Sequence, residues 1–204
     1  TEDWKKLEWY VFFFLIPSIL ILIFLLPIQI KQYLILNPSN PTLLSIFFSN
    51  YTHSEFLHLV SNLVFYLIVM FLLFNIEVNK KLFLKISLLN LLVVPILSSL
   101  FAIYFFPKAP PIQGFSAVVS AFIGYLIYSV YTHLKSVYYR QLSTLFLGFF
   151  LMINLVVWAI FNKTEFLIIF IPITSVLIFI NMKPIKEISK QIILKSNKLK
   201  EQNC

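Results

Sequence analysis

Long apolar runs dominate this chain and restrict what it can fold into. A helix that crosses a bilayer needs about 20 mostly apolar residues, and the sequence offers six candidate runs. They cover residues 7–30, 56–74, 82–106, 115–131, 142–161 and 166–180. Because lipid cannot hydrogen-bond an open backbone, runs of this length must form helices. The sequence therefore predicts an all-α polytopic membrane protein, a bundle of six transmembrane helices.

The composition agrees with a chain embedded in a membrane. Of the 204 residues, 60% are hydrophobic and 12% are charged, with a mean hydropathy of +0.90, which excludes an ordinary soluble globular domain. A net charge of +8 would suggest nucleic acid as the partner of a soluble protein, but here the lysines cluster beside apolar runs. We therefore expect contact with the lipid bilayer and no nucleic acid partner.

The basic residues also predict the orientation in the membrane. If the N-terminus is cytoplasmic, 13 of the 16 lysines and arginines fall on the cytoplasmic side, and the three others are Lys31, Lys108 and Lys163. Both termini are therefore expected to be cytoplasmic. We expect a membrane domain over residues 1–182 and a basic cytoplasmic tail over residues 183–204. This tail either lies as a helix on the inner membrane surface or frays into the cytoplasm.

Two of the expected outer connections are unusual. The first covers residues 31–55 and combines a proline- and asparagine-rich start with an apolar stretch that begins at Leu43. It predicts a loop with a short interfacial element, and loops of this length are often functional. The second covers residues 107–111, contains three prolines, and leads into Gly114. It predicts a stiff connection between the third and fourth runs.

Polar residues at membrane depth mark the second apolar run. His58 and Asn62 are four residues apart, which places them on one face of a helix, and His53 lies just before that helix. An imidazole and an amide in hydrocarbon need partners, so both side chains should point into the bundle. Such a pair either joins helices by hydrogen bonds or belongs to a functional site.

A Gly-x-Ser turn opens the fourth run. Gly114, Phe115 and Ser116 stand at its start, in a chain with only three glycines. The backbone N–H groups at a helix N-terminus have no partner within the helix, and such groups can hold an oxyanion. An ordinary N-cap is the alternative interpretation of this serine.

Together these features resemble the rhomboid family of intramembrane serine proteases. His53, His58 and Asn62 form a His-x4-His-x3-Asn pattern that follows a long outer loop and precedes the Gly-x-Ser turn. The stretch over residues 114–125 is similar to the rhomboid fourth helix, including Gly124 eight residues after the serine. The resemblance is strong over the second to fourth apolar runs. For the other runs it rests only on the number of helices and their topology.

This resemblance implies a catalytic role for several residues. Ser116 would be the nucleophile that attacks a carbonyl of a transmembrane-helix substrate and forms an acyl-enzyme. His58 and Asn62, with the backbone N–H groups of the turn at Phe115, would form the oxyanion hole. The chemistry needs neither a metal nor a cofactor.

Three further residues match positions of the family. His53 would lie at the mouth of a water-filled cavity that opens toward the non-cytoplasmic side. Gly114 would belong to the serine turn, and Gly124 would allow close packing of the fourth helix against a neighbouring helix.

The sequence departs from the family in the sixth run. Rhomboids carry their general-base histidine there, yet residues 162–180 contain neither histidine nor glycine. His133 follows Ser116 by about 17 residues, which is about 25 Å along a helix and too far away to replace that base. Ser120 stands where rhomboids usually have an aromatic residue beneath the histidine, and Ala117 replaces the usual glycine.

Loss of the base bears directly on activity. Removing one member of a serine–histidine unit typically costs on the order of 10⁶ in turnover. A replacement base could come from Lys163 or Glu165, or from Ser120 through a water molecule. Three hypotheses remain: an intramembrane serine protease with an unusual base, a rhomboid pseudoprotease that binds transmembrane-helix clients without cleaving them, and an unrelated six-helix membrane scaffold.

Overall fold

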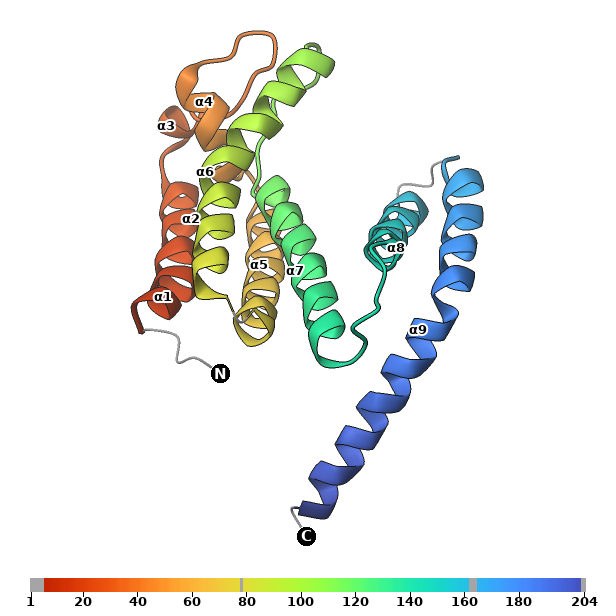
Figure 1. Cartoon of the computed structure of the whole chain (residues 1–204). Helices are drawn as coiled ribbons and strands as arrows, with labels where there is room; N and C mark the ends of the chain where they lie inside the picture. The colour runs from red at the N-terminus through yellow and green to blue at the C-terminus, as the bar shows by residue number, and fades with distance from the viewer. Residues whose placement is uncertain (1–5, 78, 162–164, 203–204) are drawn as a thin grey trace. The chain divides into compact units, whose positions relative to one another are not determined.

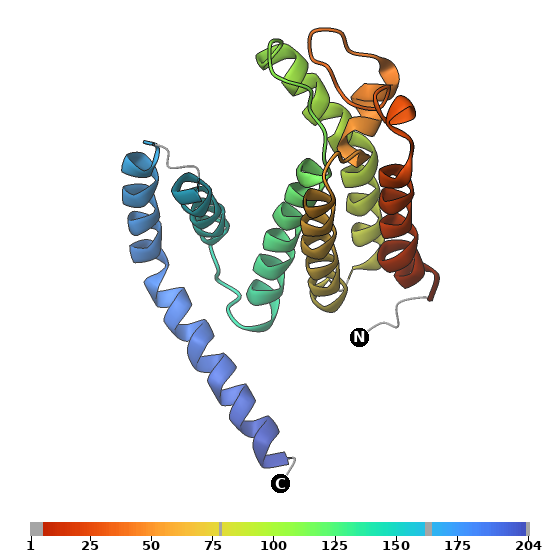
Figure 2. The same cartoon turned by 180° about the vertical axis from the view of Figure 1, so that it is seen from behind.

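The computed structural model describes residues 6–77, 79–161 and 165–202. The chain divides into two compact units, Thr1–Leu126 and Ile127–Cys204, which are described separately below. Figure 1 shows the helices in chain order and Figure 2 shows them from behind. The described chain is built of helices, as the apolar runs predict, and its only β pairing is one isolated bridge.

The first membrane segment is a continuous helical stretch of three parts. They are α1 (Lys6–Tyr10), the π-helix η1 (Val11–Leu15) and α2 (Ile16–Leu25). The expected end of this run at residue 30 is wrong, because Leu26 adopts an extended conformation, with φ −59° and ψ 145°. The residue before a proline disfavours helical geometry, and Pro27 follows. The short helix α3 (Ile28–Lys31) then begins after the break.

Among the described residues, five helical segments are long and apolar enough to cross a membrane. They are Lys6–Leu25, α5 (Phe56–Ile76), α6 (Lys80–Phe105), α7 (Ser116–Val137) and the part Leu167–Lys195 of α9. The fifth predicted run forms α8 (Leu145–Phe161), which has 17 residues and is a shorter apolar helix. The chain is thus an integral multi-pass membrane protein with five spans supported by length, and the sixth span remains a prediction.

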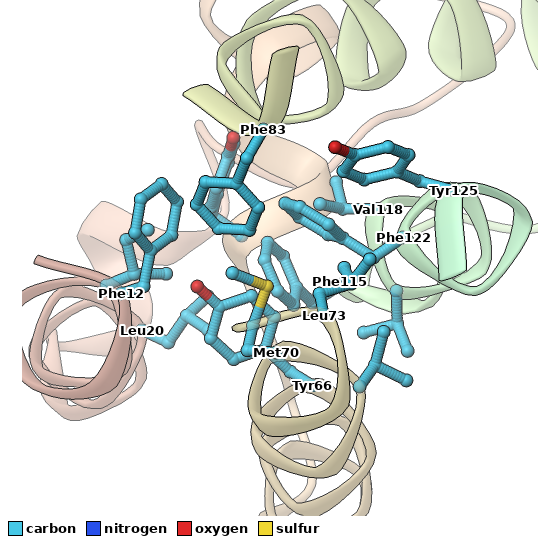
Figure 3. Packing of buried hydrophobic residues seen from close by; sticks show 14 of the residues in the cluster. Phe12, Leu20, Tyr66, Met70, Leu73, Phe83, Phe115, Val118, Phe122 and Tyr125 are labelled. Atoms are coloured by element: carbon cyan, nitrogen blue, oxygen red, sulfur yellow. The ribbon is translucent and has the colours of Figure 1, made fainter. Parts of the chain in front are cut away.

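Aromatic side chains fill the core of the first unit (Figure 3). Phe12 meets Phe83 of α6 with ring centroids 5.0 Å apart, and Tyr66 of α5 meets Phe122 of α7 at 5.7 Å. Tyr66 also contacts the ring of Phe115 at 5.6 Å. These T-shaped contacts join the first helical segment, α5, α6 and the start of α7 in one cluster. Lipid does not drive helices together by the hydrophobic effect, so close packing of this kind must hold them.

A second contact holds the middle of α7 at the C-terminal end of α5. Glu77 ends α5, and its carboxylate accepts hydrogen bonds from the Asn79 N–H at 2.9 Å and from the Tyr125 hydroxyl at 3.0 Å. The Asn79 side chain in turn caps α6 by accepting from the Leu82 N–H. The turn between α5 and α6 is therefore tied to α7.

The long first loop is ordered and contains the predicted short element. Helix α4 (Leu43–Phe48) begins with a reciprocal capping box, in which Thr42 and Ser45 each accept the other's backbone N–H. The 3₁₀ turn η2 (Ser49–Tyr51) follows directly. These elements lead into α5.

The first loop pairs with the segment between α6 and α7. Leu36 and Ile112 form an isolated antiparallel bridge, with N–H···O distances of 3.1 and 2.8 Å. The Ser39 hydroxyl donates to the Pro107 carbonyl at 2.6 Å, and the Gly114 N–H donates to the Ser49 carbonyl at 3.0 Å. The first loop therefore holds the segment that enters α7.

A proline inside α6 provides a further attachment point for the first loop. Pro95 has no N–H, so it leaves the carbonyl of Leu91, four residues earlier, without its helical partner. The hydroxyl of Tyr51 donates to this carbonyl. The residue before Tyr51, Asn50, donates from its Nδ2 to the Pro95 carbonyl at 3.1 Å. Turn η2 therefore docks on the proline site of α6.

The second unit contains α8 and α9 (Leu167–Gln202), which pack against each other. Its core includes Leu142, Phe146 and Ile188, and the Tyr131 hydroxyl donates to the Leu142 carbonyl at 3.2 Å. Helix α9 contains Pro172 and Pro184 and continues without interruption past the expected boundary at residue 182.

We expect Tyr51→Phe to destabilise the protein by about 1–3 kcal/mol, because the half-buried Leu91 carbonyl loses its donor. Thermal unfolding in detergent measures the effect, with Tyr104→Phe as the control, since Tyr104 is 79% exposed. In a Pro95→Ala background, the restored N–H at position 95 can bond this carbonyl, so Tyr51→Phe should cost less. An equal cost in both backgrounds would contradict the assignment.

Candidate active site

The turn before α7 is fixed by a buried aromatic side chain and a glycine. Phe115 is fully buried and contacts the rings of Tyr51 and Tyr66 at 5.5 and 5.6 Å. Gly114 has a φ of +122°, a region that L side chains rarely adopt. The chain therefore turns sharply at Gly114, buries Phe115 and begins α7 at Ser116.

Gly114 is also required by the space around it. A Cβ atom at this position would lie 2.7 Å from Cε1 and 3.1 Å from Nε2 of His58. The imidazole of His58 thus packs directly on the backbone of the turn. The sequence predicted that His58 and Gly114 belong to one site, and the structure brings them together.

His53 lies at the centre of the site. Its Nε2 is 3.2 Å from the backbone nitrogen of Phe115 and 3.0 Å from Nδ2 of Asn62. A backbone N–H can only donate, so Nε2 is the acceptor and the neutral ring carries its proton on Nδ1. The ring of His58 stands edge-on to that of His53, with centroids 5.1 Å apart.

His53 is completely buried and joins the first loop, α5 and the turn before α7. Its expected place at the mouth of a water-filled cavity stays a prediction. Asn62 and the Phe115 N–H, two of the predicted oxyanion donors, both point at its Nε2. The convergence of two donors on one atom is the central geometric fact of the site.

The surroundings of His53 oppose its protonation. Burial lowers the pKa of His53 to about 4, and a positive charge on the adjacent His58 ring acts in the same direction. The backbone of Tyr51 acts in the opposite direction and less strongly. Nδ1 itself has no well-aligned hydrogen-bond partner among the described residues. His53 is therefore a neutral acceptor at physiological pH.

Ser116 is the first residue of α7, and its side chain is exposed. Its hydroxyl is in no hydrogen bond with the described residues of the first unit. The N–H groups of the first helical residues have no partner within the helix. The turn thus presents a hydroxyl and open N–H groups at one place.

A small polar cavity of about 100 Å³ lies beside Ser116. Its walls come from the first loop, the end of α6 and the turn before α7. The lining residues are Leu36, Ser49, Asn50, Ser98, Ser99, Ile112, Gln113, Gly114, Ser116 and Ala117.

Sequence reasoning missed the polar residues of this cavity. Asn50 donates to Ser99 at 3.2 Å and accepts from the Ser98 hydroxyl at 3.0 Å. The buried Oε1 of Gln113 has no hydrogen-bond partner within the described chain. The available signal was the pair Ser98-Ser99 three residues after Pro95 in an otherwise apolar run, facing the polar segment that ends the first loop.

The comparisons with known proteins identify the fold family. The family model described as the rhomboid domain matches residues 40–183, which is more than half of the chain. The chain belongs to the rhomboid family. No curated protein and no solved structure matches it.

The other residues that bear on the rhomboid mechanism are described within their own units. Ser120 is exposed one turn after Ser116, and Glu165 is exposed in the second unit. Lys163 falls outside the described residues. His133 packs on Tyr138, with ring centroids 6.2 Å apart. Within residues 6–126, a Cβ at Gly124 would meet no atom within 4 Å, so its role in close packing stays a prediction.

We expect Gly114→Ala to destabilise the protein by about 1–3 kcal/mol through backbone strain, with an added cost from the contact with His58. Gly148→Ala is the control, because a Cβ there would meet no atom of its own unit within 4 Å. Thermal unfolding measures both variants. A His58→Ala background should relieve only the contact, so the cost that remains reports the strain at φ +122°.

The buried His53 should make stability depend on pH. Between pH 6.5 and about 4 the unfolded chain protonates this ring while the folded chain does not. The unfolded state then binds more protons, so stability falls as the pH is lowered, by at most about 1.4 kcal/mol per pH unit. Unfolding curves of the wild type and His53→Gln should diverge over this range. Parallel curves would contradict a depressed pKa.

Proposed function

We propose that this protein is a rhomboid-fold pseudoprotease, which binds transmembrane helices of client proteins without cleaving them. The observation that carries this proposal is the position of His53. Its Nε2 accepts from the Phe115 N–H and from Asn62, the donors that an active rhomboid site would direct at a reaction intermediate.

The geometry at Nε2 opposes the stabilisation of an oxyanion. An oxyanion hole works because its donors are preorganised and free to meet the charge that develops in the transition state. Here a substrate oxygen would have to displace a buried imidazole before it reached Asn62 or the N–H of Phe115. The cost of that displacement subtracts from the stabilisation that the donors provide.

The nucleophile also lacks a base. The general-base histidine of the family is missing from residues 162–180, and this loss alone is on the order of 10⁶ in turnover. His53 is poorly suited to replace it, because its Nε2 already accepts two hydrogen bonds and its pKa of about 4 makes it a weak base at neutral pH.

Binding, by contrast, needs only what the fold retains. A membrane-embedded protein of the rhomboid family meets the bilayer and transmembrane segments in general. The exposed hydroxyl of Ser116 at the cavity can hydrogen-bond the open backbone of a locally unwound helix. By the distribution of basic residues, this cavity would face the non-cytoplasmic side.

An intramembrane serine protease remains the second candidate. The exposed hydroxyl of Ser116, next to open N–H groups at the start of α7, favours it. In that case His53 must swing away from Phe115, and a group such as Glu165 or Lys163 must supply the base.

A reconstitution experiment separates the two functions. The full chain is placed in liposomes with a transmembrane peptide that has helix-breaking residues near one end and carries a photo-crosslinker. We expect crosslinking without cleavage, to the same extent in the wild type and in Ser116→Ala. A fluorophosphonate probe should leave Ser116 unlabelled.

Either alternative gives a clear result. Cleavage that is lost in Ser116→Ala would overturn the proposal in favour of the protease. The absence of crosslinking to any peptide above the level of a scrambled-sequence control would remove the binding function as well.

A further inference from the structure

An apolar groove lies between the first helical segment and α6, away from the site of Ser116. The cavity is about 530 Å³ and is lined from both helices. The lining residues are Leu7, Glu8, Val11, Phe12, Leu84, Lys85, Leu88 and Leu91. In Figures 1 and 2 the two helices run side by side along this length.

A second hollow extends the groove toward the first loop. It measures about 220 Å³ and shares Leu91 with the first. Its other walls are Ile16, Ile19, Ile23, Phe47, Phe48 and Tyr51, all apolar except for one hydroxyl. That hydroxyl, of Tyr51, is already bonded to the Leu91 carbonyl. Apart from Glu8 and Lys85 in the first hollow, the lining is therefore almost wholly apolar.

The groove is long enough for an acyl chain. From Leu7 to Ile23 the helix rises by roughly 24 Å at 1.5 Å per residue, which exceeds the depth of one leaflet of the hydrocarbon core, about 15 Å. Most of the lining side chains are aliphatic, and Leu88 is 61% exposed. An exposed apolar groove of this length within membrane spans is open to the lipid phase.

One end of the groove carries charge at headgroup level. Trp9 and Tyr10 are exposed there, and aromatic residues of this kind mark the membrane–water interface. Lys85 lines the groove, and Lys81 lies one turn earlier on the same face of α6. With Lys6 and Lys80 nearby in sequence, this edge of the first unit has more basic than acidic residues.

The backbone of the first helix is irregular next to this end. Residues Val11–Leu15 form a π-helix, a rare arrangement that occurs frequently at functional sites. Val11 and Phe12 of this turn form part of the groove wall. The π-helical turn thus lines the same cavity as Lys85.

We propose that this groove binds an anionic glycerophospholipid, with one acyl chain along Val11, Leu88 and Leu91. The phosphate would pair with the ammonium group of Lys85. Glu8, on the opposite wall, would accept hydrogen bonds from hydroxyl groups of a polyol headgroup such as that of phosphatidylglycerol. The lysine surplus at this edge favours an anionic over a zwitterionic lipid.

Native mass spectrometry of the full chain tests this proposal. The protein is titrated with phosphatidylglycerol, phosphatidylethanolamine or phosphatidylcholine of identical acyl chains, and the bound lipid is counted. We expect preferential retention of phosphatidylglycerol. Lys85→Gln should weaken it about tenfold, because a charge-assisted hydrogen bond is lost. Leu88→Trp should also abolish retention, by filling the groove.

Matched controls give the test its specificity. Lys108→Gln removes an exposed charge from a distant loop, and Leu89→Trp adds the same bulk at a neighbouring position that does not line the groove. Both should keep the wild-type preference. Equal retention of the three lipids, or an equal loss in Lys108→Gln, would overturn the proposal. A Leu88→Trp variant that changed from dimer to monomer would instead identify the groove as an interface between two copies.

Discussion

The turn at Gly114 and Phe115 is the constraint on which the first unit depends. Gly114 supplies a backbone conformation that other residues rarely adopt, and its missing side chain leaves room for His58. Phe115 then buries its ring between Tyr51 and Tyr66 and directs its N–H at His53. Through this one turn the first loop, α5 and α7 meet. The position of Ser116 follows from these contacts, because α7 can begin only where the turn ends.

The rest of the site is organised by hydrogen bonds to polar backbone groups that lie in an apolar environment. Pro95 leaves the Leu91 carbonyl of α6 without its helical partner, and the hydroxyl of Tyr51 takes that place. This bond and the bond from Asn50 to the Pro95 carbonyl dock the first loop on α6, and Asn50 also lines the cavity beside Ser116. An unpaired carbonyl that would be costly in lipid thus becomes the attachment point of the loop. The same hydrogen bonds serve both the packing of α6 and the position of the first loop at the site, so a substitution that breaks them should affect both.

Much of the fold could be predicted from local sequence. The apolar runs predicted helices because their length and composition leave no other structure in lipid, and the short helix α4 was expected from its apolar stretch. Pro27 indicated that the first helix ends early, but the apolar run continues past this proline, so the prediction extended the helix to residue 30. The pairing of Leu36 with Ile112 had no such signal, since it joins residues that are far apart in the chain. The polar cavity was missed for the same reason, because its walls come from three separate segments.

The sequence by itself determined that the chain is a helical membrane protein of the rhomboid family, and it predicted one site for His53, His58, Asn62 and Ser116. Those conclusions rest on composition and on spacing along the chain. Only the tertiary structure decided that His53 is buried and accepts from Asn62 and from the N–H of Phe115, 62 residues away. Spacing along the chain predicts which side chains share a helix face. Which groups donate to Nε2 of His53, however, depends on how segments distant in the chain pack together. The chemistry assigned to Ser116 therefore depends on contacts that no local pattern encodes.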